Sequence, residues 1–104
     1  RRAAATRLDA ALAGELAPYN IRVNAYIPGL TSTDITRPVI EKNRQHFQSQ
    51  IALNRIAEPE DIAGSIVFLA SDAARYMTGA FIESSGGKFC VQNPNAAWQN
   101  AAKP

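Results

Sequence analysis

Residues 20–29 read NIRVNAYIPG, an apolar run at residues 21–27 that ends at a Pro-Gly pair. Two polar residues interrupt the run, a pattern typical of a parallel strand that is covered on both faces. A hydroxyl-rich stretch, TST, occupies residues 31–33. Ligands of open parallel sheets bind beyond the carboxyl ends of the strands, and Pro-Gly provides backbone that a ligand can approach closely. The stretch therefore predicts an α/β fold and a candidate ligand site at this corner.

Helical patterns flank the strand on both sides. Residues 3–17 carry Leu8, Leu12 and Leu16 at a spacing of four, and Pro18 ends the pattern. With Ala5 and Ala11 beside the leucines, this spacing predicts an amphipathic helix with a narrow, small-residue face suited to close packing on the sheet, with Asp9 elsewhere. Residues 36–51 have an apolar side with many polar neighbours, which predicts a lid or surface helix.

The clearest helix start lies at residues 59–70, with Pro59 at the first position and two acidic residues after it. A short turn after Ser71 gives a fourth helical segment. The second strand is predicted at residues 81–84, before Gly86 and Gly87. Residues 90–104 are polar and rich in turn-forming residues, and we expect an irregular tail there.

Only two strands are predicted, and more than fifty residues with helices lie between them. This separation favours parallel strands joined by a crossover, since antiparallel neighbours need only a short turn. Two parallel strands do not make a stable sheet by themselves. The chain also begins with Arg1 rather than Met. We therefore expect a fragment of a longer protein, whose other strands lie upstream.

Composition excludes several function classes. The 104 residues are 46% hydrophobic and 19% charged, and eleven basic and nine acidic residues are scattered along the chain. No basic stripe indicates a nucleic-acid partner. No apolar run approaches the ~20 residues of a membrane span, and no secretory signal is present, so we expect a soluble, cytoplasmic protein. With one cysteine and one histidine, neither a disulfide nor a metal site is predicted.

Four motifs in order resemble the C-terminal half of the short-chain dehydrogenase/reductase family. They are ALAGELAPYNIRVNAYIPG, TSTDIT, NRIAEPEDIAGSIVFLASDAARYMTG and SGG. The resemblance covers about residues 3–89, so we expect a domain portion at residues 1–89 and a tail at 90–104. It implies the C-terminal part of a Rossmann-like, doubly wound parallel sheet, with two strands and three to four helices present. The two strands then correspond to the sixth and seventh of the family.

The resemblance also implies a cofactor, NAD or NADP, and hydride transfer to or from a small-molecule alcohol or carbonyl substrate. Pro28 and Gly29 match the turn beside the nicotinamide. Thr31 stands where backbone groups hydrogen-bond the carboxamide, and Thr33 matches a threonine whose hydroxyl contacts the carboxamide or pyrophosphate. The alternative for both threonines is a solvated loop whose side chains bond their own backbone. Residues 36–51 match the mobile substrate lid.

The chain departs from the family pattern in three places. It contains no Gly-x-x-x-Gly-x-Gly loop and no Tyr-x-x-x-Lys pair, so we assign no catalytic residue. Arg2 stands about where the lysine belongs, but it has no tyrosine to activate. Ser85 replaces an acidic residue that often precedes the glycines, and we interpret this as a tolerated change at a structural turn, with a changed subunit-interface contact as the alternative.

Three hypotheses follow. The first is a fragment of an NAD(P)-dependent oxidoreductase that carries the nicotinamide-side wall, the lid and a subunit interface of a homo-oligomer, and that is inactive alone. The second is a truncated oligomerisation or interaction module without catalytic activity. The third is a gene-model fragment. Among single residues, His46 is expected to face solvent, with a place in the substrate pocket as the alternative. Cys90 is expected to be partly buried, with a reactive thiol as the alternative. Trp98 lies in the polar tail, where covering a neighbouring subunit is the less favoured alternative.

Overall fold

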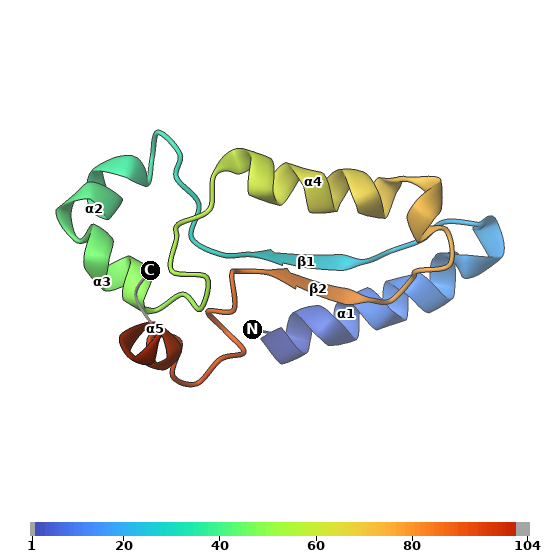
Figure 1. The fold of residues 1–104 in the computed structure, drawn as a ribbon. Helices are drawn as coiled ribbons and strands as arrows, with labels where there is room; N and C mark the ends of the chain where they lie inside the picture. The colour runs from blue at the N-terminus through green and yellow to red at the C-terminus, as the bar shows by residue number, and fades with distance from the viewer. Residues whose placement is uncertain (1, 102–104) are drawn as a thin grey trace. The chain divides into compact units, whose positions relative to one another are not determined.

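The computed structural model describes the backbone of residues 2–101 (Figure 1) and the side chains of residues 7–101. Its elements follow in the order α1 (Arg2–Leu16), β1 (Ala25–Pro28), α2 (Arg37–Lys42), α3 (Arg44–Ser49), α4 (Pro59–Ala70), β2 (Phe81–Ser84) and α5 (Ala96–Asn100). Short 3-10 helices lie at Ala17–Tyr19 and Asp72–Ala74. The chain divides into two compact units, one of residues 2–27 and 63–83 and the other of residues 28–62 and 84–101.

The first unit is built on the parallel pair β1 and β2. The backbone amide of Ala25 donates to the Ala80 carbonyl at 2.9 Å, and that of Gly79 donates to the Val23 carbonyl at 2.7 Å. Within this unit, residues 63–70 of α4 and helix α1 lie on opposite sides of the two strands (Figure 1). The predicted two-stranded parallel α/β arrangement is confirmed.

Strand β1 is shorter than the prediction of residues 21–27. Side chains replace part of the regular ladder at its beginning. The Val23 amide donates to Thr78 Oγ1 at 3.1 Å, and Asn24 uses both ends of its amide, donating to the Met77 carbonyl at 3.2 Å and accepting from the Ala80 amide at 3.0 Å. These side-chain bonds satisfy the backbone without strand geometry. Strand β2 matches its predicted bounds.

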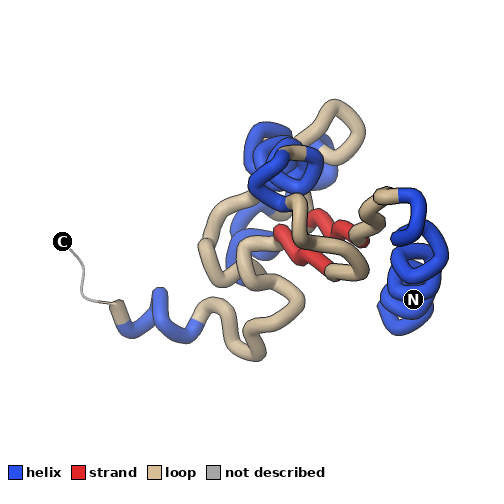
Figure 2. Tube along the Cα trace, turned by 90° about the vertical axis from the view of Figure 1, so that its right-hand side faces the viewer, coloured by secondary structure: helices blue, strands red, loops and turns tan. Residues whose placement is uncertain are grey.

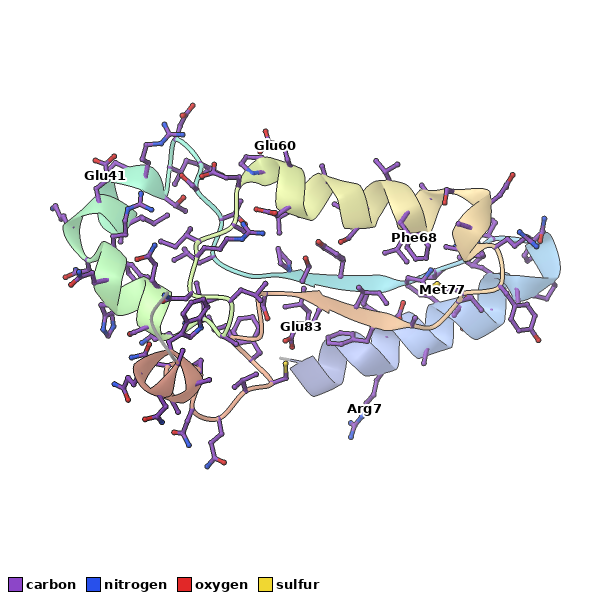
Figure 3. The ribbon with its side chains drawn as sticks, viewed as in Figure 1. Arg7, Glu41, Glu60, Phe68, Met77 and Glu83 are labelled. Atoms are coloured by element: carbon purple, nitrogen blue, oxygen red, sulfur yellow. The ribbon has the colours of Figure 1, made fainter. Side chains whose placement is uncertain are left out.

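Helix α1 confirms the predicted helix, but the prediction of its buried face is wrong. Leu8 and Leu12 are 62% and 37% exposed, whereas Asp9 and Ala13 are each 5% exposed. Arg7 points away from the helix (Figure 3). A Cβ built at Gly79 would lie 3.6 Å from the Ala13 Cβ, so the helix approaches this turn through a small residue. The buried residues Asp9 and Ala13 therefore lie outside the predicted face of Leu8, Leu12 and Leu16.

Asp9 is buried without compensation among the described residues, because neither carboxylate oxygen has a hydrogen-bond partner. An unsatisfied buried polar group costs about 1–3 kcal/mol. We therefore expect Asp9→Ala to raise the free energy of unfolding by about that amount in urea titrations followed by circular dichroism. The control is Glu15→Ala on the same helix, where the side chain is exposed. Destabilisation by Asp9→Ala would show that the carboxylate makes a bond that stabilises the fold.

In the second unit the predicted helix over residues 36–51 is two helices, α2 and α3. Asn43 separates them with φ −141° and ψ 41°, and its backbone serves both ends. Its amide donates to the Ile40 carbonyl and its carbonyl accepts from the Phe47 amide, each at 3.1 Å. Asn favours such helix ends because its side chain competes with helical bonding. The core here is Ile40, Ile51 and Ile56, with Leu30 and Phe47 packed against it.

The tail contains one short helix, α5, at the end of a long loop that follows residue 84 (Figure 2). The predicted boundary between residues 1–89 and 90–104 stays a prediction, and residues 102–104 lie outside the described part of the chain. No helix within residues 2–101 combines the length and the apolar character needed to cross a bilayer.

Candidate functional site

The Pro-Gly corner lies in the second unit, at the end of β1. The Gly29 amide donates to the Ser84 carbonyl at 2.8 Å, which continues the strand pairing past Pro28. A Cβ at Gly29 would lie 2.7 Å from the Ser85 Cα, closer than real Cβ contacts. The glycine is thus required by the neighbouring backbone, whatever the corner binds.

Thr31 is held in an extended conformation by a parallel bridge to Ala57. The Ser32 amide donates to the Ala57 carbonyl at 2.8 Å, and the Ala57 amide donates to the Leu30 carbonyl at 3.2 Å. In a parallel ladder, such bonds from the two flanking residues turn the amide and carbonyl of the central residue to the opposite edge. On that edge the Thr31 carbonyl accepts a bond from Thr36 Oγ1 at 2.6 Å.

Thr33 is exposed and is bonded to the start of α2. Its amide donates to Thr36 Oγ1 at 2.9 Å, and its Oγ1 accepts from the Thr36 amide at 3.3 Å. The Thr31 hydroxyl likewise donates to the Gly29 carbonyl at 3.0 Å. These contacts are of the local kind that a solvated Ser/Thr loop makes. A role for either threonine in binding a cofactor stays a prediction.

Arg55 and Asp61, which the sequence reasoning did not single out as a pair, lie beside the corner. Both line a cavity of about 150 Å³ whose other walls are Gly29, Leu30, Ile51, Leu53, Ala57, Ile62, Ser84, Ser85 and Gly86. The two guanidinium nitrogens of Arg55 each bond one carboxylate oxygen of Asp61 at 2.8 Å. Such forked pairs have fixed geometry.

Asp61 also closes the N-terminus of α4. Its Oδ2 accepts from the Glu58 amide at 2.8 Å, and its own amide donates to the Glu58 carbonyl at 2.9 Å. This is the third-position carboxylate of a capping box. The signal was present in the sequence as an acidic residue at that position after Pro59, but the partnership with Arg55 depends on the loop before the helix.

The pKa of Asp61 is held well below its ordinary value of 3.8, first by the Arg55 hydrogen bonds and then by the Glu58 amide. A lowered carboxyl pKa contributes stability above about pH 3.8 that is lost as the pH falls further. We expect Asp61→Asn to lower the melting temperature at pH 7, and the gap from the unaltered chain to narrow below pH 4. Melting curves from pH 7 to pH 3 measure this.

The control is Asp34→Asn. Asp34 is 98% exposed in its pair with Arg37, and we expect little change at any pH. A gap between the unaltered chain and Asp61→Asn that stays constant down to pH 3 would contradict the assignment of the acid-sensitive stability to Asp61.

The remaining single residues have mixed outcomes. His46 is exposed, as predicted. Cys90 is exposed, so the prediction of partial burial is wrong; the loop that carries it after the glycine pair does not enter the isoleucine core. Ser85 is 8% exposed at the turn after β2. The Arg2 side chain lies outside the described side chains.

Comparison with known proteins identifies the family. The sequence signature described as enoyl-(acyl carrier protein) reductase matches residues 1–88. The chain is 49% identical over 76 residues to L-rhamnose 1-dehydrogenase (NAD(P)(+)) of Azotobacter vinelandii, which covers 71% of this chain and 30% of that protein. It is 45% identical over 78 residues to 3-oxoacyl-[acyl-carrier-protein] reductase FabG of Aquifex aeolicus, covering 75% and 32%.

Solved structures agree. A short-chain dehydrogenase family protein from Francisella tularensis superimposes with a TM-score of 0.76 at 35% identity, covering 86% of this chain and 41% of that one. The chain spans about a third of the length of the two sequence relatives named above. Given the signature match over residues 1–88 and the agreement in fold, the chain belongs to the short-chain dehydrogenase/reductase family.

Proposed function

We propose that Pro28, Gly29, Thr31 and Thr33 form the nicotinamide-facing wall of a cytoplasmic NAD(P)-dependent oxidoreductase. The carrying observation is the Thr31–Ala57 bridge, which leaves the Thr31 amide and carbonyl on one edge. A carboxamide has one acceptor and two donors, so the Thr31 amide can bind its oxygen, and the Thr31 carbonyl, which has a second lone pair besides the one bonded to Thr36 Oγ1, can bind its nitrogen. Fixing the carboxamide decides which ring face meets the substrate. The cofactor class is also supported by a relative named for NAD(P)(+).

In this proposal α2 and α3 form the lid over an alcohol or carbonyl substrate, and the working protein is a homo-oligomer. The 104 residues contain neither the glycine-rich loop nor the Tyr-x-x-x-Lys pair. General-acid donation alone is worth about 10² to 10⁴ in rate. We therefore propose that the chain does not catalyse hydride transfer by itself. Nicotinamide-cofactor turnover by the purified chain, with NAD or NADP, would overturn that part of the proposal.

The wall is tested with nicotinamide mononucleotide, which carries the ring and one phosphate. We expect its amide chemical-shift changes to concentrate on residues 29–33 in two-dimensional NMR. Thr33→Val removes one hydroxyl hydrogen bond and weakens binding roughly three- to tenfold. Thr33→Ser keeps the hydroxyl and restores binding. Thr31→Val leaves binding nearly unchanged, because its proposed contacts are backbone groups.

Adenosine monophosphate is the matched control ligand, because it carries the phosphate without the nicotinamide. Equal chemical-shift changes at residues 29–33 with both nucleotides would mean that the site binds the phosphate and does not recognise the nicotinamide. No shifts at these residues with nicotinamide mononucleotide would refute the wall.

An oligomerisation module is the second candidate, and the surface of α4 favours it. Ile66, Val67 and Phe68 are 50%, 68% and 46% exposed, which is unusual for consecutive apolar residues. The expected partner is a second copy of this chain, because homo-oligomers are the common case. Sedimentation of Val67→Glu against the unaltered chain tests it. If both sediment as monomers at all concentrations, self-association through α4 is wrong.

A further inference from the structure

The segment after the glycine pair folds back onto the residues that follow α3. We name residues 50–53 the base segment, because they connect α3 to the loop that contains Arg55. Hydrogen bonds reach this segment from residues 86–98: the Leu53 amide donates to the Gly86 carbonyl at 3.0 Å, Lys88 Nζ donates to Gln50 Oε1 at 2.8 Å, and Trp98 Nε1 donates to the Ala52 carbonyl at 2.7 Å. Backbone and side chains both contribute.

Packing is close where the glycines meet the base segment. A Cβ at Gly86 would lie 2.7 Å from Ile51 Cγ2, and a Cβ at Gly87 would lie 2.7 Å from the Ala52 Cβ. The glycine pair thus allows two stretches of chain to approach without intervening side chains. Each of the four base residues contacts the C-terminal part of the chain.

The base segment is continuous with the core under the two helices. Ile51 is 3% exposed and packs with Ile40 of α2, while Phe47 of α3 lies against the same cluster. A displacement of the base segment therefore displaces the residues that hold α2 and α3. Protein cores transmit such strain because they are close-packed.

Of these contacts with the base segment, the one made by Trp98 lies farthest along the chain from the glycine pair. The residue sits in α5, a helix of five residues, and isolated helices of that length do not persist in water. Its indole N–H is bonded, while the residue remains 51% exposed. Formation of α5 and docking of the indole must therefore occur together. Residues 89–101 also lie beyond the match to the family signature, which ends at residue 88.

We propose that residues 88–101 form a C-terminal strap, and that Trp98, by docking on Ala52, is a positioning residue for α2 and α3. Docking holds the base segment in place, and release lets the two helices move. Calling α2 and α3 the lid over a substrate rests on the proposed function; the strap does not. When that function holds, the strap sets how far the substrate side of the site opens.

Trp98 is the only tryptophan of the chain, so its fluorescence reports the strap directly. In the unaltered 104-residue chain, we expect acrylamide to quench Trp98 less in buffer than in denaturing urea. Equal quenching in both would overturn the docking without any variant being needed.

Hydrogen exchange by mass spectrometry then tests the coupling. Trp98→Phe keeps an aromatic ring and removes the N–H donor, and Trp98→Ala removes both. We expect exchange at the Leu53 and Asn54 amides to rise roughly three- to tenfold in both variants, as loss of one hydrogen bond predicts. Exchange at residues 81–84 stays unchanged. Tyr76→Ala is the matched control, since Tyr76 is 100% exposed.

Two outcomes overturn the strap. Unchanged exchange at the base segment means that Trp98 does not hold it, and an equal rise in both units means that Trp98 supports global stability only. Because no cofactor or turnover enters this readout, its failure is distinct from failure of the nicotinamide wall.

Discussion

Gly86→Ala lowers the free energy of unfolding by about 2–5 kcal/mol. Gly86 has φ +65°, a left-handed conformation that disfavours a Cβ, and the added Cβ would lie 2.7 Å from Ile51 Cγ2. Ile51 belongs to the isoleucine core and has little room to withdraw. Urea denaturation followed by circular dichroism measures the change.

The control for Gly86→Ala is Gly14→Ala in α1. A Cβ there meets nothing within 4 Å, so we expect stabilisation by roughly 0.5–1 kcal/mol. A double-mutant cycle with Ile51→Ala separates the clash from the backbone strain. The pair should cost less than the two single changes together. Strict additivity would attribute the whole effect to the positive φ.

Gly29→Ala is the second large effect, and we expect it to cost about 1–3 kcal/mol. The neighbour here is the Ser85 Cα at 2.7 Å, which is backbone and cannot rotate away as a side chain does. The Gly29 amide bond to Ser84 is displaced with it. We therefore expect loss of both stability and nicotinamide mononucleotide shifts at residues 29–33.

Gly64→Ala is the matched control for Gly29→Ala, because the position is open and lies within α4. That change should stabilise the chain slightly and leave the nucleotide shifts unaltered. If Gly29→Ala were as stable as the unaltered chain, the strands would be able to separate at this corner. In that case the close approach of Gly29 to the Ser85 backbone would not be the reason that a glycine is required.

Local signals predicted the elements whose determinants are contiguous in sequence. Pro59 with the acidic residues after it predicted α4 from its first residue, and the glycines after residue 84 predicted the end of β2. The prediction of one helix over residues 36–51 was wrong because Asn43 ends one helix and begins the next. The predicted beginning of strand 21–27 was wrong because Asn24 bonds a loop more than fifty residues away along the chain.

The buried face of α1 shows most clearly what periodicity cannot decide. Leu8 and Leu12 mark an apolar stripe, yet Ala13 and Asp9 are the residues buried within the unit. The spacing shows where the leucines fall on the helix, but it does not show which residues meet the rest of the unit; Ala13 is the one that lies at the Gly79 turn. An exposed leucine stripe then remains on the surface.

Sequence alone determined the family, the α/β class, the Pro-Gly corner at a strand end and the candidate residues Thr31 and Thr33. Only the tertiary structure showed that the Ser85 backbone leaves no room for a side chain at residue 29. It alone showed the forked ion pair of Arg55 with Asp61 and the hydrogen bond from Trp98 to the Ala52 carbonyl. The reason is physical. Helix starts and strand ends depend on neighbouring residues, whereas these three contacts join residues whose separation along the chain carries no periodic signal.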